Sequence, residues 1–192
     1  MHIIVFNLNW MAFNIMLAMI PVFFGWLMIR TRTTFLKFLY GSIWFIFLPN
    51  SIYLLTDIVH FFEDWSKIGL PYRGIFIFEY MILMLFGIFS FILGLYPLEQ
   101  LFPKSKNKKQ KRKYLVIYVC NFLIGFGMVL GRVERINSWD IITNIPHVTY
   151  EIIHTITSAE LLSLAIFFGF LSNVIYFSLK NWIAPERFCK SA

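Results

Sequence analysis

Five long apolar runs are the feature of this sequence that most restricts its fold. They cover residues 8–29, 35–56, 74–96, 114–131 and 159–179. Each is close to the roughly 20 residues that a helix needs to cross the hydrocarbon core of a membrane. Open sheet edges cannot face lipid, because their backbone N–H and C=O groups would find no partners there. The sequence therefore predicts an all-α fold, a polytopic membrane bundle of about five transmembrane helices.

The composition leaves little material for a separate soluble domain. Of the 192 residues, 59% are hydrophobic and only 14% are charged, whereas about a quarter of the residues are charged in soluble proteins. We therefore expect residues 1–192 to form a single integral membrane domain.

Basic residues are concentrated at two of the connections between the runs and in the segment after the fifth run. Thirteen of the 17 Lys and Arg residues lie around the first connection, around the third connection and after the fifth run. Because cytoplasmic loops carry the excess of basic residues, we expect a multi-pass protein of the cell membrane with its N-terminus outside and its C-terminus in the cytoplasm. No nucleic-acid partner is expected, since no recognition module accompanies the charge.

A polar stripe follows the second run in the stretch FLPNSIYLLTDIVHFFED. The stripe consists of Asn50, Tyr53, Asp57, His60 and Asp64. Their offsets of three, four, three and four residues would place them on one face of a continuous helix. One interpretation is a solvated helix end. The other is a polar seam inside the bundle, where ionisable groups are functional candidates. Under the second interpretation, Asp57 and His60 are candidate catalytic acid–base groups.

The densest polar cluster is GRVERINSWD, which ends the fourth run. Arg132 and Arg135 are three residues apart, and on one helix face they would suit a phosphate or carboxylate, which a guanidinium binds through two parallel hydrogen bonds. The alternatives are contact with lipid headgroups and pairing with a carboxylate such as Asp57. Glu134 is expected to point elsewhere, into solvent.

The same stretch ends in residues that favour a turn. Asn, Ser and Asp side chains readily form hydrogen bonds with nearby backbone, so Asn137, Ser138 and Asp140 favour a turn or a helix cap. Trp139 is typical of the membrane interface. Asp140 is also a candidate catalytic group. The candidate binding residues are then Asn50, Tyr53, Asp57, Arg132, Arg135, Asn137, Ser138, Trp139 and Asp140.

Two features within the runs concern helix packing. Gly127 and Gly131 form a GxxxG pattern, which lets helices approach closely. Glu79 lies near the outer end of the third run, where a carboxylate needs either a raised pKa or a partner. Arg132 or Arg135 can supply one if the third and fourth spans are adjacent.

A short amphipathic helix is predicted in NIPHVTYEIIHTIT, lying flat on the outer leaflet. Its polar face carries His147, Glu151 and His154. Imidazole and carboxylate groups bind metals, but the spacing matches no metalloenzyme motif, and a solvated face is the more common explanation of such a pattern. No metal site is therefore predicted, and His60, His147, Glu151 and His154 are only weak candidate ligands. The sequence leaves the cofactor unknown.

Two of these stretches together resemble the DUF1361 family of bacterial multispan membrane proteins, whose function is unknown. Seven residues match a Phe-Leu-Pro-Asn-x-x-Tyr-x-x-Thr-Asp signature, namely Phe47, Leu48, Pro49, Asn50, Tyr53, Thr56 and Asp57. Seven match a Gly-Arg-x-x-Arg-x-Asn-Ser-Trp-Asp signature, namely Gly131, Arg132, Arg135, Asn137, Ser138, Trp139 and Asp140. The resemblance implies a multispan topology and a paired motif on the outer face, but no reaction.

Three functions fit these observations, and the sequence does not decide whether the protein is an enzyme. The first is the binding or processing of an anionic lipid or a lipid-linked envelope intermediate at the outer-face cluster. The second is a non-enzymatic structural or scaffold subunit, in which the cluster ties helices together and the partner is another membrane protein or a second copy. The third is a metal-dependent hydrolase that uses Asp57, His60, His147 or Asp140.

Overall fold

The computed structural model describes residues 2–102 and 108–183, and within these ranges every regular element is helical. Five helical segments are long and apolar enough to cross a membrane: Phe6–Arg30, Thr34–Trp65, Leu70–Gln100, Gln110–Arg132 and Ala159–Ile183. The prediction of an all-α, multi-pass membrane protein is therefore confirmed. Each of the five helical segments contains the whole of the corresponding apolar run.

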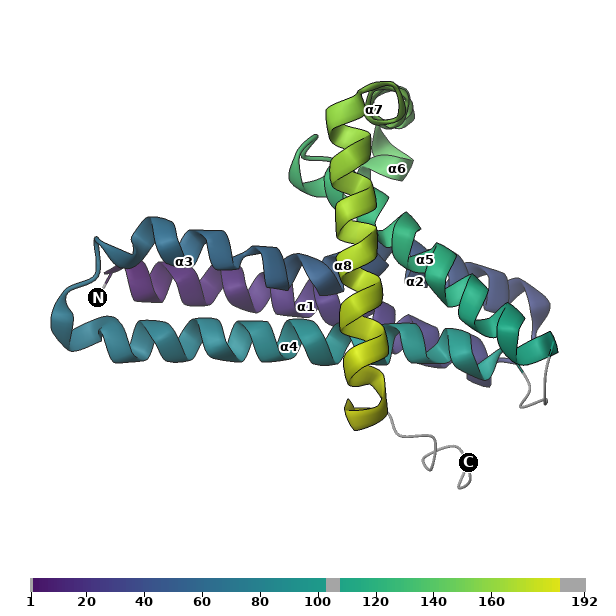
Figure 1. Cartoon of the computed structure of the whole chain (residues 1–192), viewed down its shortest axis with the longest axis horizontal. Coiled ribbons are helices and arrows are strands. Elements are labelled where there is room, and N and C mark those ends of the chain that lie inside the picture. The colour runs from purple at the N-terminus through teal and green to yellow at the C-terminus, as the bar shows by residue number, and fades with distance from the viewer. Residues whose placement is uncertain (1, 103–107, 184–192) are drawn as a thin grey trace.

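The first three long helices form one group. Helices α1 (His2–Arg30), α2 (Thr34–Thr56) and α4 (Arg73–Gln100) lie side by side in Figure 1. The second apolar segment continues beyond α2 as α3 (Ile58–Trp65), and a short 3-10 turn, η1 (Leu70–Tyr72), leads into α4. The break between α2 and α3 falls at Asp57, so the predicted polar stripe does not lie on one uninterrupted helix.

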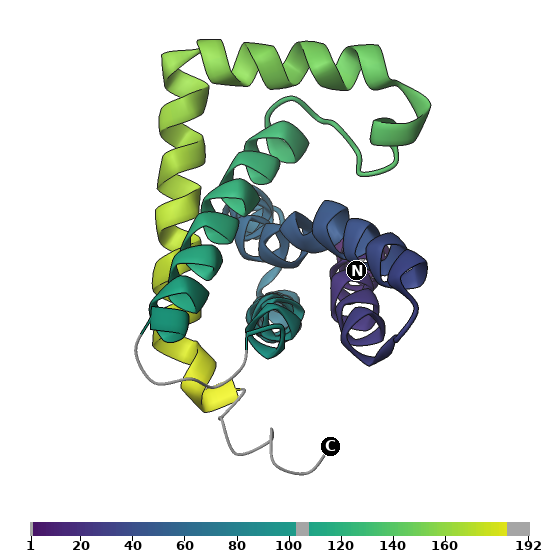
Figure 2. The ribbon, with the colours of Figure 1, turned by 90° about the vertical axis from the view of Figure 1, so that its right-hand side faces the viewer.

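The last two long helices form a second group that crosses the first. Helix α5 (Lys108–Arg132) packs along α8 (Ala159–Ile183), and α8 runs across α1, α2 and α4 rather than beside them (Figure 1). Between α5 and α8 the chain forms α6 (Asp140–Thr143) and α7 (Ile145–Thr157). Figure 2 shows α7 running across the end of α8. The predicted short helix is therefore present.

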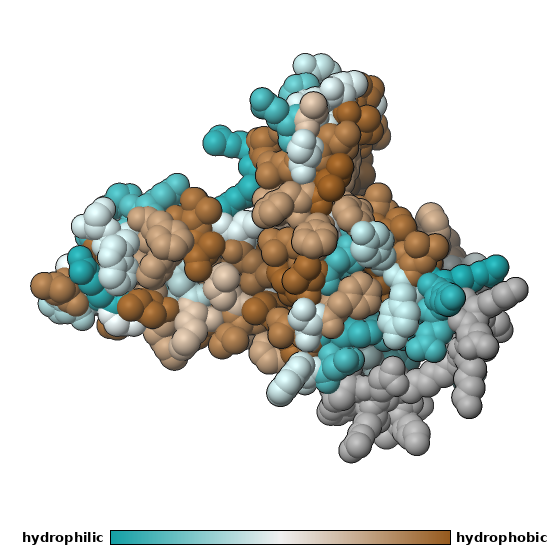
Figure 3. All heavy atoms as spheres, in the orientation of Figure 1, coloured by the Kyte–Doolittle hydropathy of each residue, from teal (hydrophilic) through white to brown (hydrophobic). Residues whose placement is uncertain are grey.

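The core lies where the two groups meet. Leu48, Phe91, Leu95, Ile117 and Tyr176 are almost fully buried there, and they come from α2, α4, α5 and α8. Many large apolar side chains remain exposed on the outside of the helices, and Figure 3 shows them covering much of the face that carries α8. Such a surface suits lipid, which solvates apolar side chains as well as a protein core does.

Close approach and buried polar contacts join α5 to α8. A Cβ added at Gly125 would overlap the backbone of Gly169, so the two helices touch through their glycines. Nearby, the amide of Asn121 donates to Asn173 Oδ1 at 3.0 Å inside the interface.

At the other end of these helices, the carboxylate of Glu99 joins α4, α5 and α8. Its oxygens accept hydrogen bonds from Lys113 at 3.2 Å, Lys180 at 3.1 Å and the Tyr176 hydroxyl at 2.7 Å. Three helices are therefore held by one acidic side chain, which is only 13% exposed.

Candidate functional site

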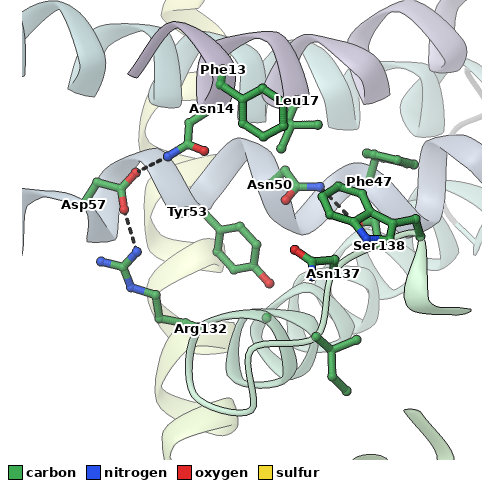
Figure 4. Close-up of a pocket in the computed structure, with 13 residues that line it drawn as sticks. Phe13, Asn14, Leu17, Phe47, Asn50, Tyr53, Asp57, Arg132, Asn137 and Ser138 are labelled. Atoms are coloured by element: carbon green, nitrogen blue, oxygen red, sulfur yellow. Dashed lines mark hydrogen bonds and ion pairs between the residues drawn. The ribbon is translucent and has the colours of Figure 1, made fainter. Parts of the chain in front are cut away.

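A cavity of about 190 Å³ lies between α1, α2 and the segment that follows α5 (Figure 4). Its polar lining residues are Asn14, Asn50, Tyr53, Asp57, Arg132, Asn137 and Ser138. Its apolar lining residues are Phe13, Leu17, Phe47, Ile136 and Trp139. Both sequence motifs therefore contribute to one cavity, together with a third wall from α1.

An ion pair between the two motifs forms one side of this cavity. Arg132 Nη1 donates to Asp57 Oδ1 at 2.6 Å, and Arg132 Nη2 donates to the carbonyl oxygen of Thr56 at 3.4 Å. The second carboxylate oxygen of Asp57 accepts a hydrogen bond from the Asn14 amide at 3.2 Å. Asp57 is 3% exposed and Arg132 is 34% exposed, so the carboxylate is the buried partner.

Two further contacts join α2 to the second motif. The Tyr53 hydroxyl donates to the carbonyl oxygen of Gly127 at 2.7 Å, and a Cβ at Gly131 would overlap that hydroxyl. The Asn50 amide donates to Ser138 Oγ at 3.2 Å. Gly131 is thus required because the ring of Tyr53 occupies the space that a side chain would need.

Seven of the nine predicted binding residues line the cavity, and Arg135 and Asp140 do not. Helix α5 ends at Arg132, and Arg135 has a φ of 57°, so the two arginines do not share a helix face as predicted. Arg135 is exposed in this turn. Asp140 accepts a hydrogen bond from the backbone N–H of Asn137 at 2.7 Å, which fits its predicted place in a turn.

The ligand set predicted for a metal hydrolase does not come together in the described residues. His60 Nδ1 lies 2.9 Å from Glu63 Oε2 rather than against Asp57, and Asp57 is paired with Arg132. His147 lies on α7, where its nearest ionic partner is Glu151.

The prediction for Glu134 was wrong, and the conditional pairing of Glu79 with an arginine does not form among the described residues. Glu134 is not solvated, because its side chain is 15% exposed and its Oε1 lies 3.5 Å from His154 Nδ1 on α7. Arg132 is bound to Asp57 and not to Glu79. Both carboxylate oxygens of Glu79 are buried without a hydrogen-bond partner among the described residues.

The polar face of α7 is turned toward the segment after α5. Glu151 is 12% exposed, while Ile145, Ile153 and Ile156 on the same helix are more than half exposed. Burial and the facing carboxylate of Glu134 raise the pKa of Glu151, and the imidazoles of the neighbouring histidines lower it in part. This face is therefore a cluster of carboxylates and imidazoles rather than a solvated surface.

Sequence reasoning missed the α1 wall of the cavity. Asn14 was not identified, although an amide inside an apolar run is a signal of a buried polar contact. Phe13, Leu17 and Phe47 carry no such signal, because apolar residues in a membrane span are unremarkable whichever way they face.

No curated protein and no solved structure matches this chain. A family model described as "Protein of unknown function (DUF1361)" matches residues 13–175, which include both motifs and all lining residues of the cavity. The match covers most of the chain and agrees with the resemblance of the two motifs. The protein therefore belongs to the DUF1361 family.

Proposed function

We propose that this membrane protein binds the headgroup of an anionic lipid or of a lipid-linked envelope intermediate in the cavity between α1, α2 and the segment after α5. The observation that supports this proposal best is the composition of the cavity wall. Polar side chains from both motifs face one space, and the space is bordered by apolar side chains. Ligand sites typically combine a few placed polar groups with such an apolar lining.

Arg132 supplies the group that would recognise a phosphate. A guanidinium carries five N–H donors, and the described contacts of Arg132 engage only Nη1 and Nη2. Asp57 compensates its charge, whereas Arg135 lies outside the cavity lining. The remaining donors of Arg132 can bind an oxyanion without breaking the pair with Asp57.

The other lining residues suit the rest of such a ligand. The Asn50 and Asn137 amides and the Tyr53 hydroxyl can form hydrogen bonds with polar headgroup atoms. Phe13, Phe47 and the 44%-exposed Trp139 border the cavity with apolar surface, which suits the first carbons of a lipid chain.

The proposed site faces outward if the charge distribution sets the orientation, with the N-terminus outside and the C-terminus in the cytoplasm of a cell membrane. A cysteine introduced at the exposed Thr149 of α7 should then react with a membrane-impermeant maleimide in intact cells. A green fluorescent protein fused to the C-terminus should fluoresce. If Thr149→Cys is labelled only after the cells are opened, the protein has the opposite orientation, with α7 in the cytoplasm.

Native mass spectrometry of the detergent-purified protein tests the ligand. The wild type should carry a bound phospholipid or polyprenyl phosphate, and Arg132→Lys should retain at least about tenfold less, since hydrogen bonds to charged groups contribute about 1.5–3 kcal/mol. Lysine keeps a positive charge beside Asp57 but lacks the planar fork. Arg135→Gln is the matched control, because Arg135 does not line the cavity.

Size-exclusion elution separates loss of ligand from loss of fold. Equal lipid retention by the wild type and a well-folded Arg132→Lys would contradict the proposal. If Arg135→Gln loses more bound lipid than Arg132→Lys does, the ligand binds outside the cavity, at the exposed turn.

The second candidate is a non-enzymatic structural or scaffold subunit, and a specific observation favours it. Asp57, Asn50 and Tyr53 of the first motif each contact the second motif or the end of α5 within the chain itself. In this case the motifs hold the ends of α2 and α5 together. Variants of the cluster would then misfold rather than lose a ligand.

A further inference from the structure

We propose that Glu134, Glu151 and His154 bind a divalent transition-metal ion, for which Zn²⁺ is the probe. The three side chains come from two segments, the turn after α5 and the helix α7. One ligand atom from each lies within 4.8 Å of the others. The proposal concerns a cluster distinct from the cavity lining and does not depend on the proposed lipid ligand.

The spacing of the ligand atoms suits an ion between them. Glu134 Oε1 lies 3.5 Å from His154 Nδ1, and Glu151 Oε2 lies 3.7 Å from the same nitrogen. Direct charge-assisted hydrogen bonds are shorter, about 2.7–2.9 Å. Ligand atoms that surround Zn²⁺ tetrahedrally at about 2.0–2.2 Å from the ion are about 3.3–3.6 Å apart. The two observed distances therefore lie at or just beyond the edge of such a tetrahedron.

The charges of the cluster also call for a cation. Glu134 and Glu151 are 15% and 12% exposed, and neither forms a salt bridge with Lys or Arg among the described residues. Two carboxylates held together away from water repel each other, and either a shared proton or a cation between them relieves that repulsion. The set of two carboxylates and an imidazole suits Zn²⁺ and related ions better than Ca²⁺, which prefers oxygen ligands alone.

Two neighbouring groups can complete the coordination. His147 Nδ1 lies 3.6 Å from Glu151 Oε1, where it can orient that carboxylate or take a fourth position. Thr155 lies one turn beyond Glu151 on the same face of α7. It is fully buried, and its hydroxyl has no hydrogen-bond partner among the described residues, so it is available to a water bound to the ion.

Such an ion would fix α7 to the turn that carries the second motif. Glu134 lies between the two arginines of that motif, whereas Glu151 and His154 lie about one turn apart on α7. Where His147 only orients Glu151, the three protein ligands leave the fourth position open to water, as in catalytic zinc sites.

Zinc uptake by the whole chain tests the proposal. The protein is purified in detergent with a tag free of histidine, stripped with EDTA and titrated with Zn²⁺ against a chromophoric chelator. We expect one equivalent to bind and the melting temperature to rise. His154→Ala and Glu134→Gln should each weaken binding by at least about tenfold, the smallest effect expected for a lost ligand.

His60→Ala is the matched control, since His60 is an exposed histidine paired with Glu63 and lies outside the cluster. Its zinc affinity should equal that of the wild type. Equal zinc affinity in His154→Ala and the wild type would overturn the proposal, and so would the absence of a bound equivalent. If His154→Ala elutes as aggregate, the isosteric Glu134→Gln decides between the outcomes. Because zinc itself is measured, failure here leaves the lipid proposal untouched.

Discussion

Replacing Arg132 with glutamine should destabilise the protein by about 3–5 kcal/mol, the cost of leaving one partner of a buried ion pair alone. Asp57 is 3% exposed and would keep only the hydrogen bond from Asn14. Replacing Asp57 with asparagine should cost less, because Arg132 is 34% exposed and water can solvate the unpaired guanidinium. The order of the two effects follows from the unequal burial of the partners.

The double variant Arg132→Gln/Asp57→Asn completes a thermodynamic cycle. It should be more stable than Arg132→Gln alone, since no charge is then left buried. Reversible unfolding in mixed micelles gives the four free energies. If the effects of the two substitutions on the free energy of unfolding are additive, Arg132 and Asp57 are not coupled. The ion pair would then no longer support a structural or scaffold role for the protein.

Replacing Gly125 with alanine should disrupt the packing of α5 on α8. The new methyl group would overlap the backbone of Gly169, and backbone cannot move aside as a flexible side chain can. We expect the free energy of unfolding to fall by an amount at or above the upper end of the roughly 1–3 kcal/mol that overpacking costs. Thermal unfolding followed by intrinsic fluorescence measures it.

Gly74→Ala is the matched control for this substitution. Gly74 lies at the start of α4, and a Cβ there would meet no atom within 4 Å. It should therefore be neutral or slightly stabilising, because alanine favours a helix over glycine. Equal melting temperatures for the two variants would show that the contact between α5 and α8 is looser than described.

The helices could be predicted from the sequence because lipid leaves few alternatives to a long apolar helix. The contact between the two motifs was also among the predicted alternatives, since a buried carboxylate such as Asp57 needs a cation. The sequence could not show which of the two arginines would pair with Asp57. Arg132 is the last residue of α5, and the chain turns at Arg135, so only Arg132 is held beside Asp57.

The contacts that could not be predicted join segments far apart in the sequence. Gly127 and Gly131 were identified as packing residues, and they face Pro49 and Tyr53 of α2. Gly125, which faces α8, belongs to no motif that spacing alone would reveal. Glu134 was expected in solvent because the helix was assumed to continue past Arg132, and its contact with His154 depends on a turn that folds toward α7.

Helix α5 is anchored by charge at both of its ends, through Arg132 to Asp57 and through Lys113 to Glu99. At 1.5 Å per residue, the two anchoring residues are about 28 Å apart along the axis, close to the thickness of the hydrocarbon core. The helix cannot slide along its own axis, relative to Asp57 and Glu99, without stretching an ion pair at one end or the other. The two ion pairs thus fix the position of α5 along its own axis. Because the helix is continuous between them, a displacement of Arg132 along the axis would also displace Lys113.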